Sequence, residues 1–193
     1  MVDLTDKPNT STRGLWLTVI TVFVAILVPA TYILTCALYP IRYQETVEAV
    51  AQEYDLPPSL LYAVIHTESG FRPDAQSSAN AKGLMQITDE TYNWARQMGK
   101  TSEKKDVSVL YDPEKNIRYG GLILHLLQKE FDSTETVLAA YNAGQGHVRT
   151  WLKDPSYSED GCTLYDIPFR ETKTYVRRVL RTQKRYQKFY HID

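Results

Sequence analysis

The chain has 193 residues and a formal net charge of −1 at pH 7, so it lacks the basic excess on which nucleic-acid binding depends. A hydrophobic fraction of 43% and a charged fraction of 23% are typical of a globular protein and not of a disordered one. The length leaves room for one ordinary domain plus an appendage.

The first predicted element is a membrane-spanning helix. No charged residue occurs from Gly14 to Ile41, and residues 15–38 are dominated by Leu, Ile, Val, Phe and Ala. About 20 apolar residues are enough to cross a bilayer as a helix. We therefore predict an anchor at residues 15–39, preceded by a short cytoplasmic N-terminus at residues 1–14.

Two alternatives to an uncleaved anchor are less consistent with the sequence. A cleaved signal peptide has an apolar region of about 7–15 residues and a small-x-small cleavage site. This run is longer, and Thr35-Cys36-Ala37 matches the site poorly. Lipidation at Cys36 is disfavoured by the bulky Ile33-Leu34 pair before it.

The charges that flank the apolar run predict its orientation. Lys7 and Arg13 precede it, whereas Arg42 is followed by several glutamates. The positive-inside rule then places the N-terminus in the cytoplasm and the C-terminal part outside. The expected location is a single pass in the cytoplasmic membrane, with the C-terminal part on the extracytoplasmic side.

Residues 41–193 are predicted to form an all-α domain of short helices. The expected helices cover residues 43–54, 57–70, 90–98, 112–131, 137–142 and 169–190. Asp112-Pro113 is a typical cap and first turn, and Ser133 is a typical cap. Residues 76–88 and 154–166 are expected to be loops.

Glu68 occupies an unusual position in the second of these helices. The apolar stripe of Leu61, Val64 and Ile65 continues to it at helical spacing. A carboxyl group buried there would have a raised pKa and stay protonated, as a general acid must. Alternatively, the side chain bends to solvent or pairs with a lysine or arginine.

Four short motifs occur in a fixed order along this domain. They are Glu68-Ser69-Gly70-Phe71-Arg72-Pro73, Gly83-Leu84-Met85-Gln86-Ile87, Ala139-Ala140-Tyr141-Asn142-Ala143-Gly144, and Ile167-Pro168-Phe169-Arg170-Glu171-Thr172 with Tyr175-Val176. From about Tyr43 to Tyr190 the chain resembles the soluble lytic transglycosylases, a lysozyme-like group of glycosidases that act on peptidoglycan.

The resemblance implies a lysozyme-like α-helical fold with a substrate cleft, peptidoglycan glycan strands as the partner, and no cofactor. Glu68 falls on the catalytic glutamate of the family. The implied substrate-binding residues are Ser77, Gln86, Tyr141, Asn142, Glu171 and Tyr175. One departure is Ile87-Thr88-Asp89, where many members have a methionine followed by a proline, which puts contacts at one subsite in doubt.

Several of these residues also have plain structural interpretations. Gln86 could hold a loop together, Ser78 offers the same hydroxyl as Ser77, and Asn142 could simply end a helix. Tyr175 lies on the packing face of the last helix, and Glu171 suits a first helical turn. The basic residues of that helix could form a solvated face or attract anionic polymers or lipids.

No metal centre or disulfide framework is expected. Cys36 lies in the apolar run and Cys162 in a polar loop, and the four histidines are scattered without zinc-ligand spacing.

The resemblance implies a reaction in which one carboxylate is enough. Glu68 would protonate the bond between N-acetylmuramic acid and N-acetylglucosamine, then deprotonate the 6-hydroxyl of the muramic acid, leaving a 1,6-anhydro end. A hydrolytic muramidase would need a second carboxylate to hold a water, and Asp74 and Asp89 are the nearest in sequence. A non-catalytic module that binds the cell wall is the third alternative.

Overall fold

A computed structural model of the protein describes residues 10–100 and 105–193, with side chains from Gly14 onward. The chain divides into two compact units, one that ends at Pro40 and one from Ile41 to Asp193. Of the predicted cytoplasmic N-terminus, residues 1–9 lie outside the described residues.

The first unit is a single long helix, α1 (Thr10–Leu38). Its segment Gly14–Leu38 is 25 residues long, apolar enough to cross a membrane, and exposed along its length. Pro29 lies within the helix without ending it. The hydroxyls of Thr18, Thr21 and Thr35 each donate a hydrogen bond to a carbonyl one turn earlier. Such internal pairing satisfies the polar groups that a lipid environment would leave without partners.

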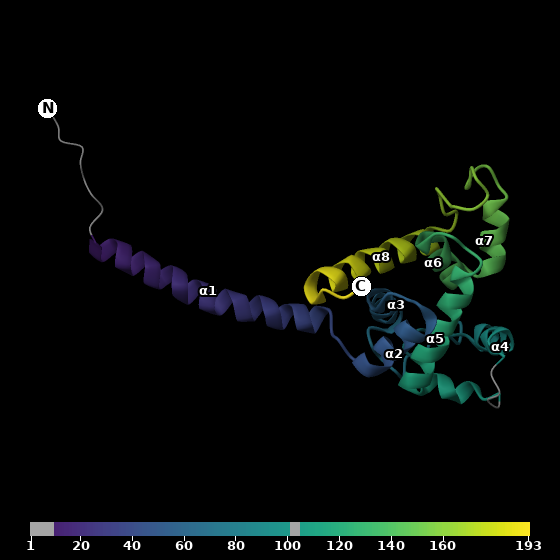
Figure 1. The fold of residues 1–193 in the computed structure, drawn as a ribbon, viewed down its shortest axis with the longest axis horizontal. Coiled ribbons are helices and arrows are strands. Elements are labelled where there is room, and N and C mark those ends of the chain that lie inside the picture. The colour runs from purple at the N-terminus through teal and green to yellow at the C-terminus, as the bar shows by residue number, and fades with distance from the viewer. Residues whose placement is uncertain (1–9, 101–104) are drawn as a thin grey trace. The chain divides into compact units, whose positions relative to one another are not determined.

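The second unit is all-α, which confirms the predicted fold class; none of the residues that the structure describes forms a strand beyond isolated bridges (Figure 1). Its helices are α2 (Gln44–Tyr54), α3 (Pro58–Ser69), α4 (Asp89–Met98), the 3₁₀ turn η1 (Val107–Tyr111), α5 (Pro113–Gln128), α6 (Thr134–Ala143), α7 (Gln145–Leu152) and α8 (Arg170–Tyr190).

The core is built around α3. Residues 59–65 of this helix are all buried, and α3 packs against α2 and α8. The Tyr62 ring stacks on Tyr186 of α8 with ring centroids 5.3 Å apart. On the other side of the core, α5 packs against α2, α4 and α6. The last turn of α3, before Ser69, is partly exposed, and the site lies there.

Local signals explain most helix boundaries. The side chains of Asp112, Ser133 and Thr88 each accept a backbone N–H of the first turn that follows. Several expectations differ from the structure. The helix expected at residues 137–142 begins three residues earlier, at Thr134, and the 3₁₀ turn η1 was not predicted. The helix expected to reach Phe131 ends at Gln128, and α7 was not predicted. Because α7 begins between two glycines, its eight residues have a weak helical signal.

Candidate active site

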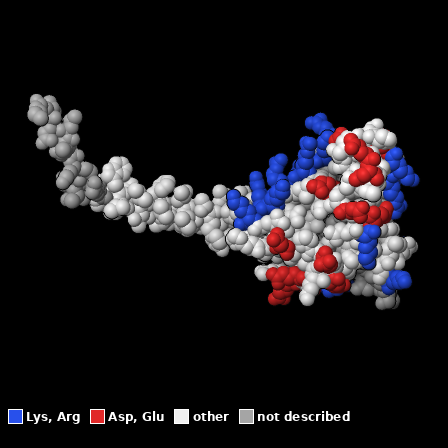
Figure 2. All heavy atoms as spheres, turned by 45° about the horizontal axis from the view of Figure 1, so that its top comes forward, with Lys and Arg blue, Asp and Glu red and all other residues white. Residues whose placement is uncertain are grey.

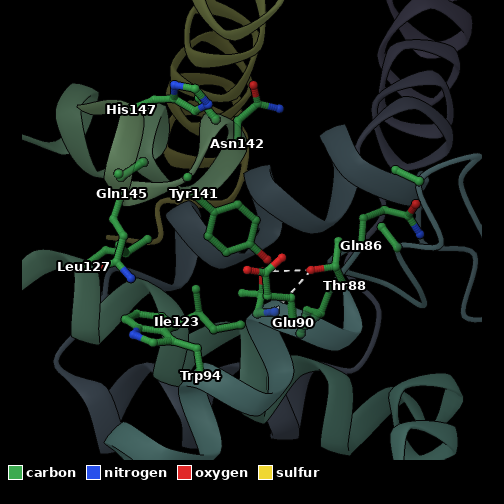
Figure 3. Close-up of a pocket in the computed structure, with 18 of the residues that line it drawn as sticks. Gln86, Thr88, Glu90, Trp94, Ile123, Leu127, Tyr141, Asn142, Gln145 and His147 are labelled. Atoms are coloured by element: carbon green, nitrogen blue, oxygen red, sulfur yellow. Dashed lines mark hydrogen bonds between the residues drawn. The ribbon is translucent and has the colours of Figure 1, made fainter. Parts of the chain in front are cut away.

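A pocket of about 690 Å³ opens beside the last turn of α3. Three sets of residues form its walls: α4 and α5, the α6–α7 corner, and the segment from Ser77 to Thr88. In Figure 3 the Tyr141 ring projects from α6 into the pocket, with Trp94 and Ile123 facing it from the opposite wall. Residues that are far apart in sequence therefore surround a single space.

Glu68 lines this pocket from the C-terminal end of α3. The chain turns sharply just after it, because Gly70 and Phe71 both have positive φ angles, of 60° and 64°. Burial raises the pKa of the Glu68 carboxyl to about 7, and a hydrogen bond from Tyr175 acts in the opposite direction. The carboxyl group is therefore poised to exchange a proton near neutral pH.

Two phenols accompany Glu68. The Tyr141 Oη donates to the Met85 carbonyl at 2.8 Å, and Tyr175 is buried on α8. Burial and the charge on Glu68 keep the pKa of both phenols well above the usual value. The Tyr175 hydroxyl has no other hydrogen-bond acceptor among the described residues, and the Glu68 carboxyl is the acceptor available to it. Both tyrosines remain protonated donors across the physiological range.

Ser77 and Gln86 lie on the pocket wall and also organise the loop that carries them. The Ser77 Oγ accepts the Ala81 N–H at 3.1 Å, which leaves its own proton to donate. The Gln86 Nε2 donates to the carbonyls of Ala75 and Gly83 at 3.1 and 2.9 Å. The side-chain nitrogen of Gln86 therefore holds the loop together, as one interpretation of the sequence suggested. Its side-chain carbonyl oxygen stays available to a ligand.

Buried polar contacts fix the segment around Gly83 against the helices. The Asn116 amide donates to the carbonyls of Lys82 and Leu110 and accepts the Met85 N–H at 2.8 Å. The Ser69 Oγ donates to the Leu84 carbonyl, also at 2.8 Å. The residue that follows Glu68 is therefore tied to the loop that forms one wall of the pocket.

The sequence departs from the family pattern at residues 87–89, which lie at the start of α4. Thr88 caps this helix by accepting the Thr91 N–H at 3.2 Å, and both threonines line the pocket. Asp89 instead pairs with the buried Lys82. Neither Asp89 nor Asp74 is among the residues that line the pocket, but Glu90 is. Glu90 is thus the second carboxylate of the pocket wall, a position that the sequence did not reveal.

Two of the residues implied by the resemblance lie off the pocket wall. Tyr175 lies behind Glu68, and Glu171 is exposed in the first turn of α8. Asn142 does line the pocket. The further lining residues that sequence reasoning missed include Trp94 on α4, Leu127 on α5, and Gln145 and His147 on α7. The apolar periodicity of α4 indicated only packing, and that of α7 was too short to interpret.

Nothing in the described residues gathers three His, Cys, Asp or Glu side chains that could hold a metal ion. The groups available for chemistry in the pocket are carboxyl, hydroxyl, amide and imidazole groups.

Sequence comparisons assign this arrangement to a family. The model of the transglycosylase SLT domain matches residues 45–161, and the chain belongs to this family. The soluble lytic murein transglycosylase of Escherichia coli is 33% identical over 153 residues, which cover 78% of this chain and 24% of that protein. The membrane-bound lytic murein transglycosylase C of Serratia proteamaculans is 30% identical over 172 residues, which cover 76% of this chain and 47% of that protein.

Solved structures agree with the family and confirm the lysozyme-like fold. The 70 kDa soluble lytic transglycosylase of E. coli superposes with a TM-score of 0.70 at 30% identity, covering 79% of this chain and 25% of that one. An inactive glutamate-to-glutamine mutant of Slt from Pseudomonas aeruginosa superposes with a TM-score of 0.67 at 31% identity, covering 79% and 25%. The chain therefore spans about a quarter of the length of these soluble relatives.

Proposed function

We propose that this protein is a membrane-anchored lytic transglycosylase that cleaves the glycan strands of peptidoglycan, with Glu68 as its catalytic residue. The observation that carries the proposal is the partly buried carboxyl of Glu68 in the pocket, with a pKa raised to about 7. Family membership and the names of the relatives support the same activity. In this proposal residues 41–193 are the catalytic domain and residues 15–39 the anchor, with the domain on the extracytoplasmic side.

The reaction begins with protonated Glu68. Its proton passes to the oxygen of the bond between N-acetylmuramic acid and N-acetylglucosamine as that bond breaks. The acetamido group of the muramic acid stabilises the developing charge at C1. The carboxylate then takes the proton of the 6-hydroxyl on the same sugar, and that oxygen closes onto C1. Glu68 returns to its acid form, and no water is consumed.

The surrounding polar groups are assigned roles that match their geometry. Tyr175 stabilises the carboxylate formed midway, because its hydroxyl lowers the pKa of Glu68. The hydroxyl of Ser77, the amide oxygen of Gln86 and the Asn142 amide line the wall and are assigned to the acetamido and hydroxyl groups of the glycan. Trp94, Ile123 and Leu127 supply an apolar wall for a sugar ring. Glu171 is assigned no direct contact, because it lies off the wall.

A hydrolytic muramidase is the second candidate, and Glu90 is the observation that favours it. Hydrolysis by inversion needs a second carboxylate to activate a water across the ring from the acid. Glu90 is exposed on the pocket wall and could take that role, whereas Asp89 is held by Lys82. The two candidates therefore predict opposite consequences for the loss of Glu90.

An isosteric pair of variants tests the proposal. Glu68→Gln keeps shape and polarity but cannot exchange a proton in the same way, so turnover of purified peptidoglycan should fall by about 10²–10⁴-fold. Glu90→Gln is the matched control and should retain most of the turnover. Co-sedimentation with glycan strands should be similar for both, because the remaining wall contacts persist. Near-normal turnover by Glu68→Gln would remove this residue from its role, and loss of turnover in Glu90→Gln would favour the hydrolase.

A further inference from the structure

The exposed face of α8 carries a concentrated positive charge. The helix has eight lysines and arginines and one acidic residue, Glu171. The whole chain has 22 basic and 23 acidic residues, which leaves 14 basic against 22 acidic elsewhere. The protein is therefore nearly neutral in total but strongly asymmetric, with a basic helix on an acidic body. Figure 2 shows the blue side chains as a ridge along one side of the second unit.

The cations of α8 share one side of the helix. At 3.6 residues per turn, the exposed ones fall within an arc of about 120°. We call this arc the basic face; its members are Arg170, Arg177, Arg178, Arg181, Lys184, Arg185 and Lys188. Lys173 lies at its edge and pairs with Asp166. The opposite side of α8 is buried and carries Tyr175, Val179 and Tyr186.

Most of these charges are not used to hold the domain together. Arg185 has an interaction of its own within the protein. The other members of the basic face take part in none of the salt bridges found among the described residues. The α8 residue that does form one of these salt bridges is Lys173. Like charges this close on one helix repel each other in the isolated protein. A surface with this arrangement is stabilised when it meets a surface of opposite charge.

The covalent connection to α1 identifies which anionic surface lies within reach. Residues 39–43 are all that separate the end of α1 from the start of α2. Five extended residues span at most about 18 Å. A domain on so short a connection stays beside the bilayer, where anionic headgroups attract Lys and Arg side chains within about one Debye length, roughly 8 Å at physiological ionic strength.

We propose that the basic face of α8 binds anionic lipid headgroups of the membrane in which α1 is anchored, and that this contact sets the orientation of the catalytic domain. The inference rests on the proposed anchoring role of α1. No residue of α8 is among those that line the pocket. Docking through the basic face therefore involves none of the residues that line the pocket.

The test measures orientation in the full-length protein on vesicles. A donor dye is placed on Thr174→Cys, an exposed position within the basic face, or on Gln97→Cys of α4, which lies away from α8 (Figure 1). Cys36 and Cys162 are replaced by serine in both proteins. Energy transfer to a headgroup-labelled lipid is compared on phosphatidylcholine vesicles and on vesicles that also contain phosphatidylglycerol.

The expected result is a shift of the ratio of transfer at position 174 to transfer at position 97. The ratio should rise on the anionic vesicles and return toward its neutral-vesicle value at high salt, because salt screens the attraction. The variant Arg177→Gln/Arg178→Gln/Arg181→Gln/Lys184→Gln should lose the rise. The control Lys105→Gln/Lys115→Gln/Lys129→Gln/Lys153→Gln removes the same charge from exposed positions elsewhere and should keep it.

The outcomes separate the two proposals. Flotation of the protein with neutral vesicles shows that α1 anchors it, and failure to float would overturn the anchoring proposal. Flotation with an equal ratio on both vesicle types would overturn the lipid contact alone. An equal ratio, together with binding of a soluble anionic wall polymer that the variant of the basic face loses, would assign the basic face to that polymer. The helical circular dichroism of both quadruple variants confirms that they are folded.

Discussion

At Glu68, the burial of one carboxyl group has consequences for both catalysis and stability. A pKa of about 7 keeps the acid protonated below neutral pH, so kcat/KM should fall as the pH rises through that value.

The folded chain also binds the Glu68 proton more tightly than the unfolded chain, in which the pKa of this group is near 4.5. The free energy of unfolding therefore falls as pH rises from about 4.5 through 7, and the site lowers stability where Glu68 is ionised.

Removing the Tyr175 hydroxyl should raise the pKa of Glu68 further. Tyr175→Phe deletes the hydrogen bond that stabilises the carboxylate, while the ring continues to fill the space on α8. The alkaline limb of the kcat/KM profile should therefore move to higher pH, and site-resolved NMR titration of Glu68 should show the same direction.

Tyr141→Phe is the comparison variant, because the hydroxyl of Tyr141 donates to the Met85 carbonyl. It should move the pKa of Glu68 less than Tyr175→Phe does. An unchanged or lowered pKa in Tyr175→Phe would show that Tyr175 acts only in packing.

Among the elements, the segment around Gly83 leaves no room for a side chain at that glycine. A Cβ at this residue would lie 2.1 Å from the Leu110 carbonyl oxygen and 2.3 Å from the Asn116 amide, and its φ of 74° already disfavours other residues. At Gly70 the φ is 60°, but nothing lies within 4 Å of the position that a Cβ would take. A side chain at Gly70 would therefore meet backbone strain alone, whereas one at Gly83 would meet both backbone strain and a steric clash.

Alanine at the two glycines should therefore have unequal effects on stability. Gly70→Ala should lower the free energy of unfolding by about 1–2 kcal/mol through its φ angle alone. Gly83→Ala should lower it by at least about 3 kcal/mol, because a clash with backbone and with buried Asn116 is added to the strain. Urea denaturation of both variants measures the difference, and equal effects would show that the segment moves aside without cost.

The same elements show what the sequence could and could not predict. The apolar stripe of α3 and the long amphipathic pattern of α8 predicted both helices and placed Glu68 near the core, because a repeated 3.6-residue period is a strong signal. The pocket wall formed by Trp94 and His147 was not predicted. Their position depends on how α4, α5 and α7 pack together, which a periodic pattern along one helix does not encode.

Glu90 shows that the sequence also could not predict which acidic residue lines the pocket. In sequence it is an acid in a first helical turn, where the helix dipole favours one. Its neighbour Asp89 was one of the two candidates for a second catalytic carboxylate, with Asp74, but the Asp89 side chain pairs with Lys82. Which of two adjacent acids meets the pocket depends on the helix start that Thr88 caps.

The whole molecule combines an apolar helix, an α-helical unit of the SLT family and a basic face on α8. The pocket lies on the side formed by α4 to α7, and the basic face lies on α8. An enzyme of this design would work on glycan strands close to the membrane. In the reaction that we propose, one carboxylate, Glu68, cuts the strand without water.

Analysis of the released muropeptides distinguishes the 6-hydroxyl from water as the nucleophile. Purified peptidoglycan is digested with the full-length protein in detergent, and the muropeptides are examined by mass spectrometry before and after borohydride reduction. We expect 1,6-anhydro-N-acetylmuramic acid ends, one water lighter than hydrolytic products and unchanged by borohydride, because the tethered 6-hydroxyl needs no separate positioning. Hydrated ends that take up hydrogen on reduction would contradict the claim, since water would then be the nucleophile and Glu90 its expected base.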